Sequence, residues 1–286
     1  MRDQTMTDTI LLGLIGDNIA ASQSPRLHRL AGAQNGRRVR YDSLIPRLEG
    51  LDFDALFARC AAGGYRGINV TYPYKEVVAD RLRIDDPLVA AIGACNTVLF
   101  GDGPPRGFNT DYLGFVAAYR RVRGDAAPGP VLMIGAGGVG RAVAFGLIAL
   151  GASQIRLADR DPARADALAM ALRAARPGLS VVTGTDAAAM AVGAAGVINC
   201  TPVGMVGHDG TPLDGALMAG ADWAFDAVYT PVDTQFLRDA QAAGLDIISG
   251  YELFIGQGVD AWAIFTGLPL DQDRLRADLA AGRDAS

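Results

Sequence analysis

The sequence predicts an α/β fold of two domains, the second of which is a doubly wound sheet. Strand-like apolar runs alternate with stretches of helical periodicity along nearly the whole chain. A polar segment rich in Pro and Gly, residues 123–130, interrupts this alternation, and a strand that ends in closely spaced glycines follows it. The 286 residues are enough for two domains that each bury a core.

The first 122 residues are expected to form an α/β domain built from parallel units. The strand-like runs lie at 10–16, 39–45, 66–71 and 96–100. The helical stretches lie at 24–34, 51–64, 74–82 and 110–122.

The run VLMIGAGGVG ends in Gly135, Gly137 and Gly140, with the spacing G-x-G-x-x-G between a strand and a helical stretch. In that context the first glycine permits a tight turn, the second lets backbone approach a pyrophosphate, and the third lets helix and strand pack closely. A second strand, QIRLAD, ends in Asp159, and Asp161 and Pro162 then open another helix. The sequence therefore predicts a Rossmann dinucleotide site, with Asp159 on the adenosine ribose.

Further strands at 179–183, 196–200, 223–229 and 245–249 complete the doubly wound sheet. Residues 123–249 are therefore expected to form the dinucleotide-binding domain, and residues 250–286 read as two helices.

Composition argues against nucleic acid and metal as partners and indicates a cellular location. The net charge of -5, without a basic run, argues against nucleic acid. Three dispersed cysteines and two histidines offer little to a zinc site or a disulfide framework, so we expect no metal. The apolar segment near the N-terminus is too short for a membrane span or a signal sequence, which makes cytoplasmic location the default expectation.

Three clusters in the first domain carry groups that could act on a substrate. Lys75 should open a helix at the carboxyl edge of a buried strand, where the helix dipole opposes its charge and favours proton exchange. Asp111 precedes an apolar helix, and Ser22 and Ser24 occupy alternate positions of an expected extended loop. Each also has an ordinary explanation: a solvated lysine, a helix N-cap, and a serine at a helix start.

Other polar groups have plainer explanations. Tyr72 and Tyr74, on either side of Pro73, are expected to be packing residues. His28 is expected on the surface of a helix, so neither it nor the loop residue His208 resembles a catalytic base.

Taken together, the ordered motifs resemble the shikimate and quinate/shikimate dehydrogenase family. They are ASQSP, NVTYPYK, GACNT, FNTD, GAGGVG, NCTPVGM, DAVYTP and GYELFIGQ, and they run from Gly13 to Gly267. The resemblance implies a substrate domain at residues 1–122, joined by the C-terminal helices 250–286, and a Rossmann domain at 123–249. It also implies reversible hydride transfer between NAD(P) and the ring carbinol of a hydroxylated cyclic carboxylate.

The resemblance assigns roles to individual residues. Lys75 would exchange the hydroxyl proton, and Asp111 would orient it. The substrate would meet Ser22, Ser24, Thr71, Asn96, Tyr229 and Gln257. The cofactor would meet Gly135, Gly137, Gly138, Val139, Gly140, Asp159, Arg164, Thr201, Val228 and Gly250.

Cofactor and substrate choice follow from smaller features. Family members that use NADP carry a motif similar to N-R-T after the second strand, whereas this chain has Asp159, Arg160 and Asp161. Two carboxylates at this place would repel the ribose phosphate of NADP. NAD is therefore expected, and Arg160 leaves NADP open. Shikimate is expected as a substrate and quinate as a second one. The sequence leaves monomer and homodimer open.

Two alternatives remain at this point. A dehydrogenase of the methylenetetrahydrofolate type shares the architecture, but it needs a broad aromatic pocket. A catalytically silent protein that senses NAD(P) would keep the Rossmann half and lose Lys75 or Asp111, and both are present.

Overall fold

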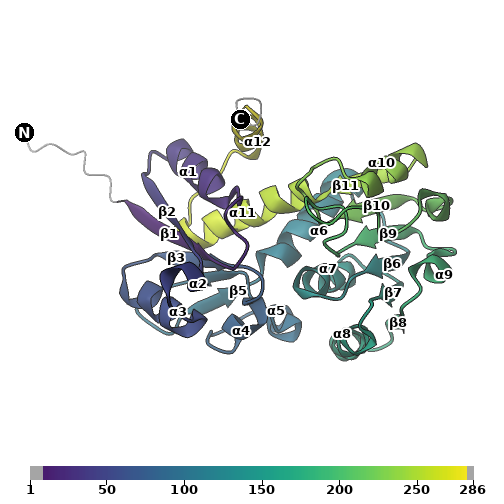
Figure 1. The fold of residues 1–286 in the computed structure, drawn as a ribbon, viewed down its shortest axis with the longest axis horizontal. Helices are drawn as coiled ribbons and strands as arrows, with labels where there is room; N and C mark the ends of the chain where they lie inside the picture. Colours follow the sequence, from purple (N-terminus) through teal and green to yellow (C-terminus); the bar gives the residue numbers. More distant parts are fainter. Residues whose placement is uncertain (1–8, 282–286) are drawn as a thin grey trace, which may run out of the picture. The chain divides into compact units, whose positions relative to one another are not determined.

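The chain folds into two compact α/β units in a computed structural model, which describes residues 9–281 (Figure 1). Unit 1 holds the described residues up to Thr110 and those from Gln257 onward. Unit 2 is the continuous segment Asp111–Gly256. Each unit has its own sheet, so the predicted α/β class with two units is confirmed.

Unit 1 contains a five-stranded mixed sheet in the order β2-β1-β3-β4-β5. The strands are β1 (Ile10–Ile15), β2 (Val39–Leu44), β3 (Gly67–Val70), β4 (Thr97–Leu99) and β5 (Arg106–Phe108). β1, β2 and β3 are parallel, but β4 is antiparallel to both β3 and β5. The expectation of parallel units alone was therefore wrong. The connection between β4 and β5 is a short loop of Gly and Pro, which suits a hairpin and is too short for a parallel crossover.

Most helices of unit 1 begin at residues that commonly start helices, such as Asp at the N-cap or Pro in the first turn. They are α1 (Ser24–Gln34), α2 (Pro46–Glu49), α3 (Phe53–Ala62), α4 (Lys75–Ala79), α5 (Pro87–Ile92) and α12 (Gln272–Ala280). Asp52 caps α3 and Asp86 caps α5, each accepting a backbone N–H through its carboxylate.

The last long helix, α11 (Gly250–Thr266), begins in unit 2 and ends in unit 1. Its residues Trp262 and Phe265 pack in one buried cluster with Leu12, Leu14 and Tyr41 of β1 and β2. Figure 1 shows this return, with the yellow α11 beside the purple strands. Helix α11 therefore completes a core that the first strands begin.

Unit 2 contains a six-stranded sheet in which every pair is parallel. The order is β11-β10-β9-β6-β7-β8, so the chain starts in the middle, winds to one edge and then to the other. The strands are β6 (Pro130–Ile134), β7 (Gln154–Ala158), β8 (Ser180–Gly184), β9 (Gly196–Asn199), β10 (Trp223–Asp226) and β11 (Asp246–Ser249). This is the doubly wound Rossmann order, as predicted.

One helix precedes the first strand of unit 2, and a helix lies between each pair of consecutive strands. They are α6 (Thr110–Arg123), α7 (Gly138–Ala149), α8 (Pro162–Ala175), α9 (Ala187–Ala191), the 3-10 helix η1 (Gly215–Met218) and α10 (Gln235–Ala242).

The units divide after Thr110 and Gly256, whereas the predicted boundaries were 122/123 and 249/250. Aromatic packing explains the shift. Phe115 of α6 contacts Phe225 edge-on at 5.0 Å, and Tyr119 contacts Trp223 in the same way at 5.0 Å. The polar segment that was expected to be the linker instead joins α6 to β6 inside unit 2.

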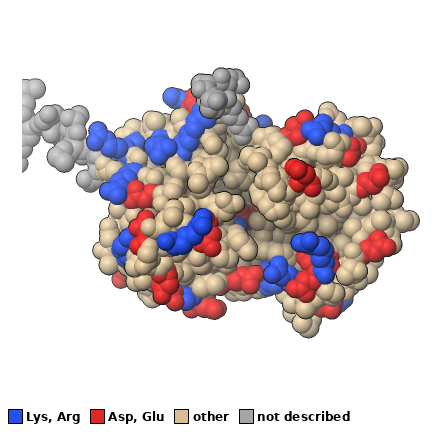
Figure 2. All heavy atoms as spheres, viewed as in Figure 1, with Lys and Arg blue, Asp and Glu red and all other residues tan. Residues whose placement is uncertain are grey.

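Charged side chains of both signs are spread over the face shown in Figure 2. Within residues 9–281, none of the helices is both long enough and apolar enough to cross a membrane.

Candidate active site

In the glycine-rich turn, some glycines are required by close packing and another leaves space in which a ligand can approach. Gly135 has φ +100°, in the left-handed region that glycine alone adopts readily. A Cβ on Gly140 would lie 2.2 Å from the Gly135 carbonyl oxygen, so this position must be glycine for packing. A Cβ on Gly137 would meet nothing within 4 Å, so the space beside it is open to a ligand.

Helix α7 begins within this turn, at Gly138. Its N-cap, Gly137, has no side chain to satisfy the first N–H groups, and Gly138 and Val139 are only partly buried. Free N–H groups at a helix N-terminus favour an anion such as a pyrophosphate. The chemistry of this turn therefore fits a dinucleotide.

Asp159 follows β7 and is tied to the glycine-rich turn. Its Oδ2 accepts the Ala136 N–H at 2.7 Å, and its Oδ1 accepts the Asp161 N–H at 2.9 Å. Asp161 caps α8 through the Ala163 N–H and lies 3.5 Å from Arg164 Nε. Two carboxylates therefore stand beside the end of β7, as the sequence suggested.

A buried carboxylate that the sequence reasoning missed organises the ends of β9 and β10. Asp226 is fully buried and accepts from Asn199 Nδ2 at 2.9 Å, Val228 N–H at 2.9 Å and Thr234 Oγ1 at 2.6 Å. Burial raises its pKa to about 6, against the lowering effect of these hydrogen bonds. The signal in the sequence was an acid at the carboxyl end of the apolar strand WAFD.

The same network fixes further predicted cofactor residues. Asn199 Oδ1 accepts both the backbone N–H and the hydroxyl of Thr201, at 2.9 and 2.7 Å. Gly250 starts α11, and a Cβ there would lie 2.6 Å from the carbonyl oxygens of Ala227 and Val228. Thr201, Val228 and Gly250 are thus brought to the carboxyl edge of the unit 2 sheet.

Tyr229 follows Val228 in the same unit. Its ring stacks on Phe254 at 5.2 Å, and burial raises the pKa of its hydroxyl. The negative charge of Asp111 contributes to this rise in pKa.

In unit 1 the two serines lie in a turn and not in the expected extended loop. The Ser22 N–H bonds to the Ile19 carbonyl, Gln23 has right-handed helical angles, and Ser24 is the first residue of α1. Because the turn curls, the Ser24 N–H reaches back to Ser22 Oγ at 3.2 Å. The two side chains are neighbours for this reason and not through strand alternation.

The structure also brings together two predicted substrate residues that are 161 positions apart. Asn96, directly before β4, is buried, and its Nδ2 lies 3.3 Å from Gln257 Oε1 on α11. Asn96 Oδ1 accepts the Thr110 N–H at 2.8 Å. Asp111 follows Thr110 inside the first turn of α6, so it is not the N-cap that was considered in the sequence analysis.

Lys75 opens α4 after β3, as predicted, and is partly buried. Thr71 begins the intervening loop and its N–H bonds to the Ile15 carbonyl at 2.9 Å. The chain has 26 basic residues, of which Lys75 is the only lysine. Arginine stays charged in proteins, so Lys75 is the one side chain among these 26 that can both give up and take up a proton. The sequence reasoning overlooked this count.

Two expectations about aromatic residues were wrong. Tyr72 is 76% exposed and does not pack, while Tyr74 stacks on Phe53 at 4.8 Å and donates to Asp17 at 2.8 Å. His28 is 2% exposed and not on the surface, and it stacks on Tyr41 at 5.0 Å. Burial lowers the pKa of His28 to about 3. The apolar face of α1, which includes Leu27 and Ala31, turns His28 inward.

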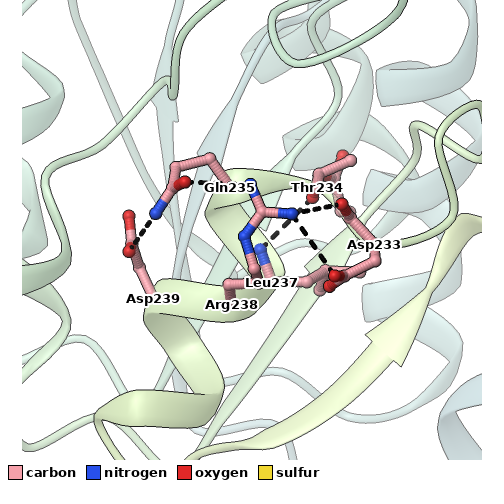
Figure 3. A network of polar contacts seen from close by, with 7 residues as sticks. Asp233, Thr234, Gln235, Leu237, Arg238 and Asp239 are labelled. Atoms are coloured by element: carbon pink, nitrogen blue, oxygen red, sulfur yellow. Dashed lines mark hydrogen bonds and ion pairs between the residues drawn. The ribbon is translucent and has the colours of Figure 1, made fainter.

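A hollow of about 330 Å³ lies beside the start of α10 and contains none of the predicted site residues. Arg238 lines it and donates to the carbonyl of Asp233 at 2.7 Å and to Gln235 Oε1 at 2.9 Å. Figure 3 shows the guanidinium turned toward these partners. It also lies 3.3 Å from Asp233 Oδ2, so its charge is paired within the protein.

Comparisons with known proteins agree with this arrangement. A family model described as the shikimate dehydrogenase substrate binding domain matches residues 14–98, and one described as NADP oxidoreductase, coenzyme F420-dependent, matches residues 130–207. A quinate/shikimate dehydrogenase (NAD(+)) of Corynebacterium efficiens is 42% identical over 277 residues, which are 94% of this chain and 97% of that protein.

Two further relatives differ in cofactor. A shikimate dehydrogenase (NADP(+)) of Arthrobacter sp. is 39% identical and covers 94% of this chain and 94% of its own. The structure of a quinate dehydrogenase from Corynebacterium glutamicum in complex with NAD has a TM-score of 0.90 and 35% identity, covering 96% of this chain and 99% of that one. From these similarities and the matching fold, the chain belongs to the shikimate and quinate/shikimate dehydrogenase family.

Proposed function

We propose that this protein transfers a hydride reversibly between NAD and the ring carbinol of shikimate or quinate. The observation that carries the proposal is Lys75, the only lysine of the chain, at the carboxyl end of β3 in a family of dehydrogenases for these acids. A carbinol loses a proton as its hydride leaves, so the reaction needs a group that can take up that proton. Lys75 is that group in this proposal.

Around this step the neutral polar groups bind the ring. Ser22, Ser24, Thr71, Asn96, Gln257 and Tyr229 supply hydroxyls and amides, which suit a ligand with several hydroxyls. Asp111 works with Lys75, orienting its ammonium and holding a neighbouring hydroxyl. The meeting of Asn96 with Gln257 supports this assignment, because it joins two of the family motifs in one hydrogen bond.

The cofactor would lie on the glycine-rich turn, with its pyrophosphate at the N-terminus of α7 and its nicotinamide near Thr201, Val228 and Gly250. When bound, NAD supplies the acceptor for the hydride. Asp159 and Asp161 support a preference for NAD, because each adds negative charge where NADP carries a phosphate. The relatives use either cofactor, so the charges at these two positions are the discriminating feature.

Replacing Lys75 tests the catalytic assignment. Lys75→Arg keeps the charge and removes the exchangeable proton, so we expect NADH to bind as before while turnover of shikimate and quinate falls by at least about a hundredfold. Glu76→Gln, an exposed neighbour on the same helix, is the matched control and should keep full activity. Wild-type protein that binds NADH but oxidises neither acid would instead indicate a silent nucleotide sensor.

Removing one carboxylate at a time tests the cofactor preference. Asp161→Asn keeps a residue that can cap α8 and removes only its charge. We expect Asp159→Asn and Asp161→Asn each to shift the ratio of kcat/KM for NAD and NADP toward NADP by roughly tenfold, about 1.4 kcal/mol. Asp186→Asn, at the N-cap of α9, is the control. An unchanged ratio in both variants would contradict the charge argument.

A further inference from the structure

The loop between β3 and α4 carries Thr71 and leads directly into Lys75. Backbone hydrogen bonds hold its two ends. The Thr71 N–H donates to the Ile15 carbonyl at 2.9 Å, and the Lys75 carbonyl accepts the Cys95 N–H at 2.9 Å. Pro73, in the middle of the loop, has no N–H to donate. The middle therefore needs contacts from elsewhere to keep a single position in front of Lys75.

Asp17, in the loop between β1 and α1, supplies two of these contacts. Its backbone N–H donates to the Tyr72 carbonyl at 3.2 Å, and its Oδ1 accepts the Tyr74 hydroxyl at 2.8 Å. Burial, together with the hydrogen bond and the negative charge of Asp17, raises the pKa of Tyr74, so the hydroxyl keeps its proton and donates. One residue thus holds the β3–α4 loop through both a backbone group and a side chain.

Close packing keeps the Tyr74 hydroxyl at Asp17. A Cβ on Gly16 would lie 2.3 Å from Thr71 Cγ2, so the two loops touch beside this hydrogen bond. The ring of Tyr74 stacks on Phe53, with 4.8 Å between the ring centroids. The Tyr74 N–H also donates to the Thr71 carbonyl at 2.9 Å. Tyr74 is the N-cap residue of α4 and directly precedes Lys75, so its placement fixes where that helix begins.

We propose that Asp17 and Tyr74 are positioning residues that hold Lys75 in place for proton transfer. This inference rests on the proposed function, in which Lys75 takes up the carbinol proton, and deepens it. Neither residue needs to touch the substrate, because both act on the chain that leads into Lys75. The loop that carries the predicted serines and the loop that leads to the lysine are joined by this pair.

The pair should act on the rate of reaction more than on substrate binding. The Thr71 N–H is held by β1, and the Ser22 and Ser24 turn is held by its own hydrogen bonds. None of these contacts involves the Tyr74 hydroxyl. A small displacement of a reacting group lowers the rate steeply, so loss of the Tyr74 hydroxyl should lower kcat and leave KM for the acids nearly unchanged.

Tyr74→Phe tests the proposal, because it keeps the ring on Phe53 and removes only the hydroxyl. We expect kcat for oxidation of shikimate and quinate with NAD to fall by about tenfold, while KM for each acid stays within about twofold. Urea unfolding under the assay conditions gives the folded fraction, and rates are compared per folded molecule. Tyr65→Phe is the matched control, since it removes another tyrosine hydroxyl of unit 1, which donates to Asp42 at 2.7 Å, and should keep the wild-type kcat.

Changes at Asp17 supply the second arm. Asp17→Ala should lower kcat as Tyr74→Phe does, and combining the two should cost no more than either alone. Asp17→Asn keeps an oxygen that can accept the Tyr74 proton, so its kcat should stay within about twofold of wild type.

Three results would overturn the positioning role while leaving the proposed function intact. They are an unchanged kcat in Tyr74→Phe, an effect confined to KM, and equal losses of kcat in Asp17→Asn and Asp17→Ala. A loss in Tyr65→Phe as large as that in Tyr74→Phe would overturn it as well. If wild type oxidised neither acid, the proposed function would fail and this inference with it.

Discussion

Asp226 should make the stability of unit 2 depend on pH in an unusual direction. Burial raises its folded-state pKa to about 6, from an ordinary value of 3.8. The folded protein therefore holds the proton more tightly than the unfolded chain, and this carboxyl group stabilises the fold as pH falls. The contribution is fully present below about pH 4 and is lost as pH rises through about 6.

The size of the effect follows from the shift. About two pKa units correspond to about 3 kcal/mol between the fully protonated and fully ionised limits. Between pH 7 and pH 5, where the folded state gains most of a proton, the expected change is about 1.3 kcal/mol. The charge of Asp226 also acts on the Cys200 thiol, but burial raises the pKa of this thiol, so it stays neutral over this range.

Asp226→Asn removes this titration, and urea unfolding measures it. The chain has two tryptophans, Trp223 in unit 2 and Trp262 in unit 1, both fully buried. In a Trp262→Phe background, the fluorescence of Trp223 reports unit 2. The free energy of unfolding of the protein that retains Asp226, relative to that of the Asp226→Asn variant, should rise by about 1.3 kcal/mol from pH 7 to pH 5.

A second carboxyl group with a raised pKa provides the control. Burial also raises the pKa of Asp260 to about 6, but this residue lies on α11 in unit 1. Asp260→Asn should leave the pH dependence reported by Trp223 unchanged. If the stability difference between the Asp226→Asn variant and its parent stays constant from pH 7 to pH 5, the reasoning is refuted.

Two further predictions concern glycine and cysteine. Gly140→Ala should lower the melting temperature markedly, because its Cβ would lie 2.2 Å from a backbone oxygen, whereas Gly137→Ala should melt near the wild-type temperature and lose NADH binding, measured by fluorescence. Equal melting temperatures for the two variants would contradict this division. Burial raises the pKa of Cys95 to about 12 and that of Cys60 to about 11, so iodoacetamide at pH 8 should label both only after denaturation, as read by mass spectrometry. Rapid labelling of native protein would show that these thiols are not protected by burial.

Much of unit 2 could be predicted because its signals are local. The spacing of Gly135, Gly137 and Gly140 fixes the turn, and Asp161 with Pro162 fixes the start of α8. The antiparallel β4 and β5 could not be predicted in the same way. β5 is only three residues long and was not among the predicted strands, so the hairpin that it forms with β4 was not recognised.

Side-chain orientation and burial were harder to predict than secondary structure. His28 lies in a helix that the sequence places correctly, but its burial depends on β2 and α11, which are distant in sequence. The Asp226 network likewise joins Asn199 and Thr234 across two loops. Periodicity contains no information about such partners. In contrast, counting the residues of the sequence is enough to show that Lys75 is the only lysine.

The discontinuity of unit 1 has a consequence for how the chain matures on the ribosome. Residues 111–256 form a continuous unit, and within it α6 and α11 approach closely at Gly114 and Gly256. Unit 1 lacks Trp262 and Phe265 until α11 has emerged from the ribosome. Until then, part of the apolar surface of strands β1 and β2 stays exposed to solvent. The segment translated second is therefore expected to fold first, and the nascent N-terminal strands are the stretch that chaperones have the longest time to bind.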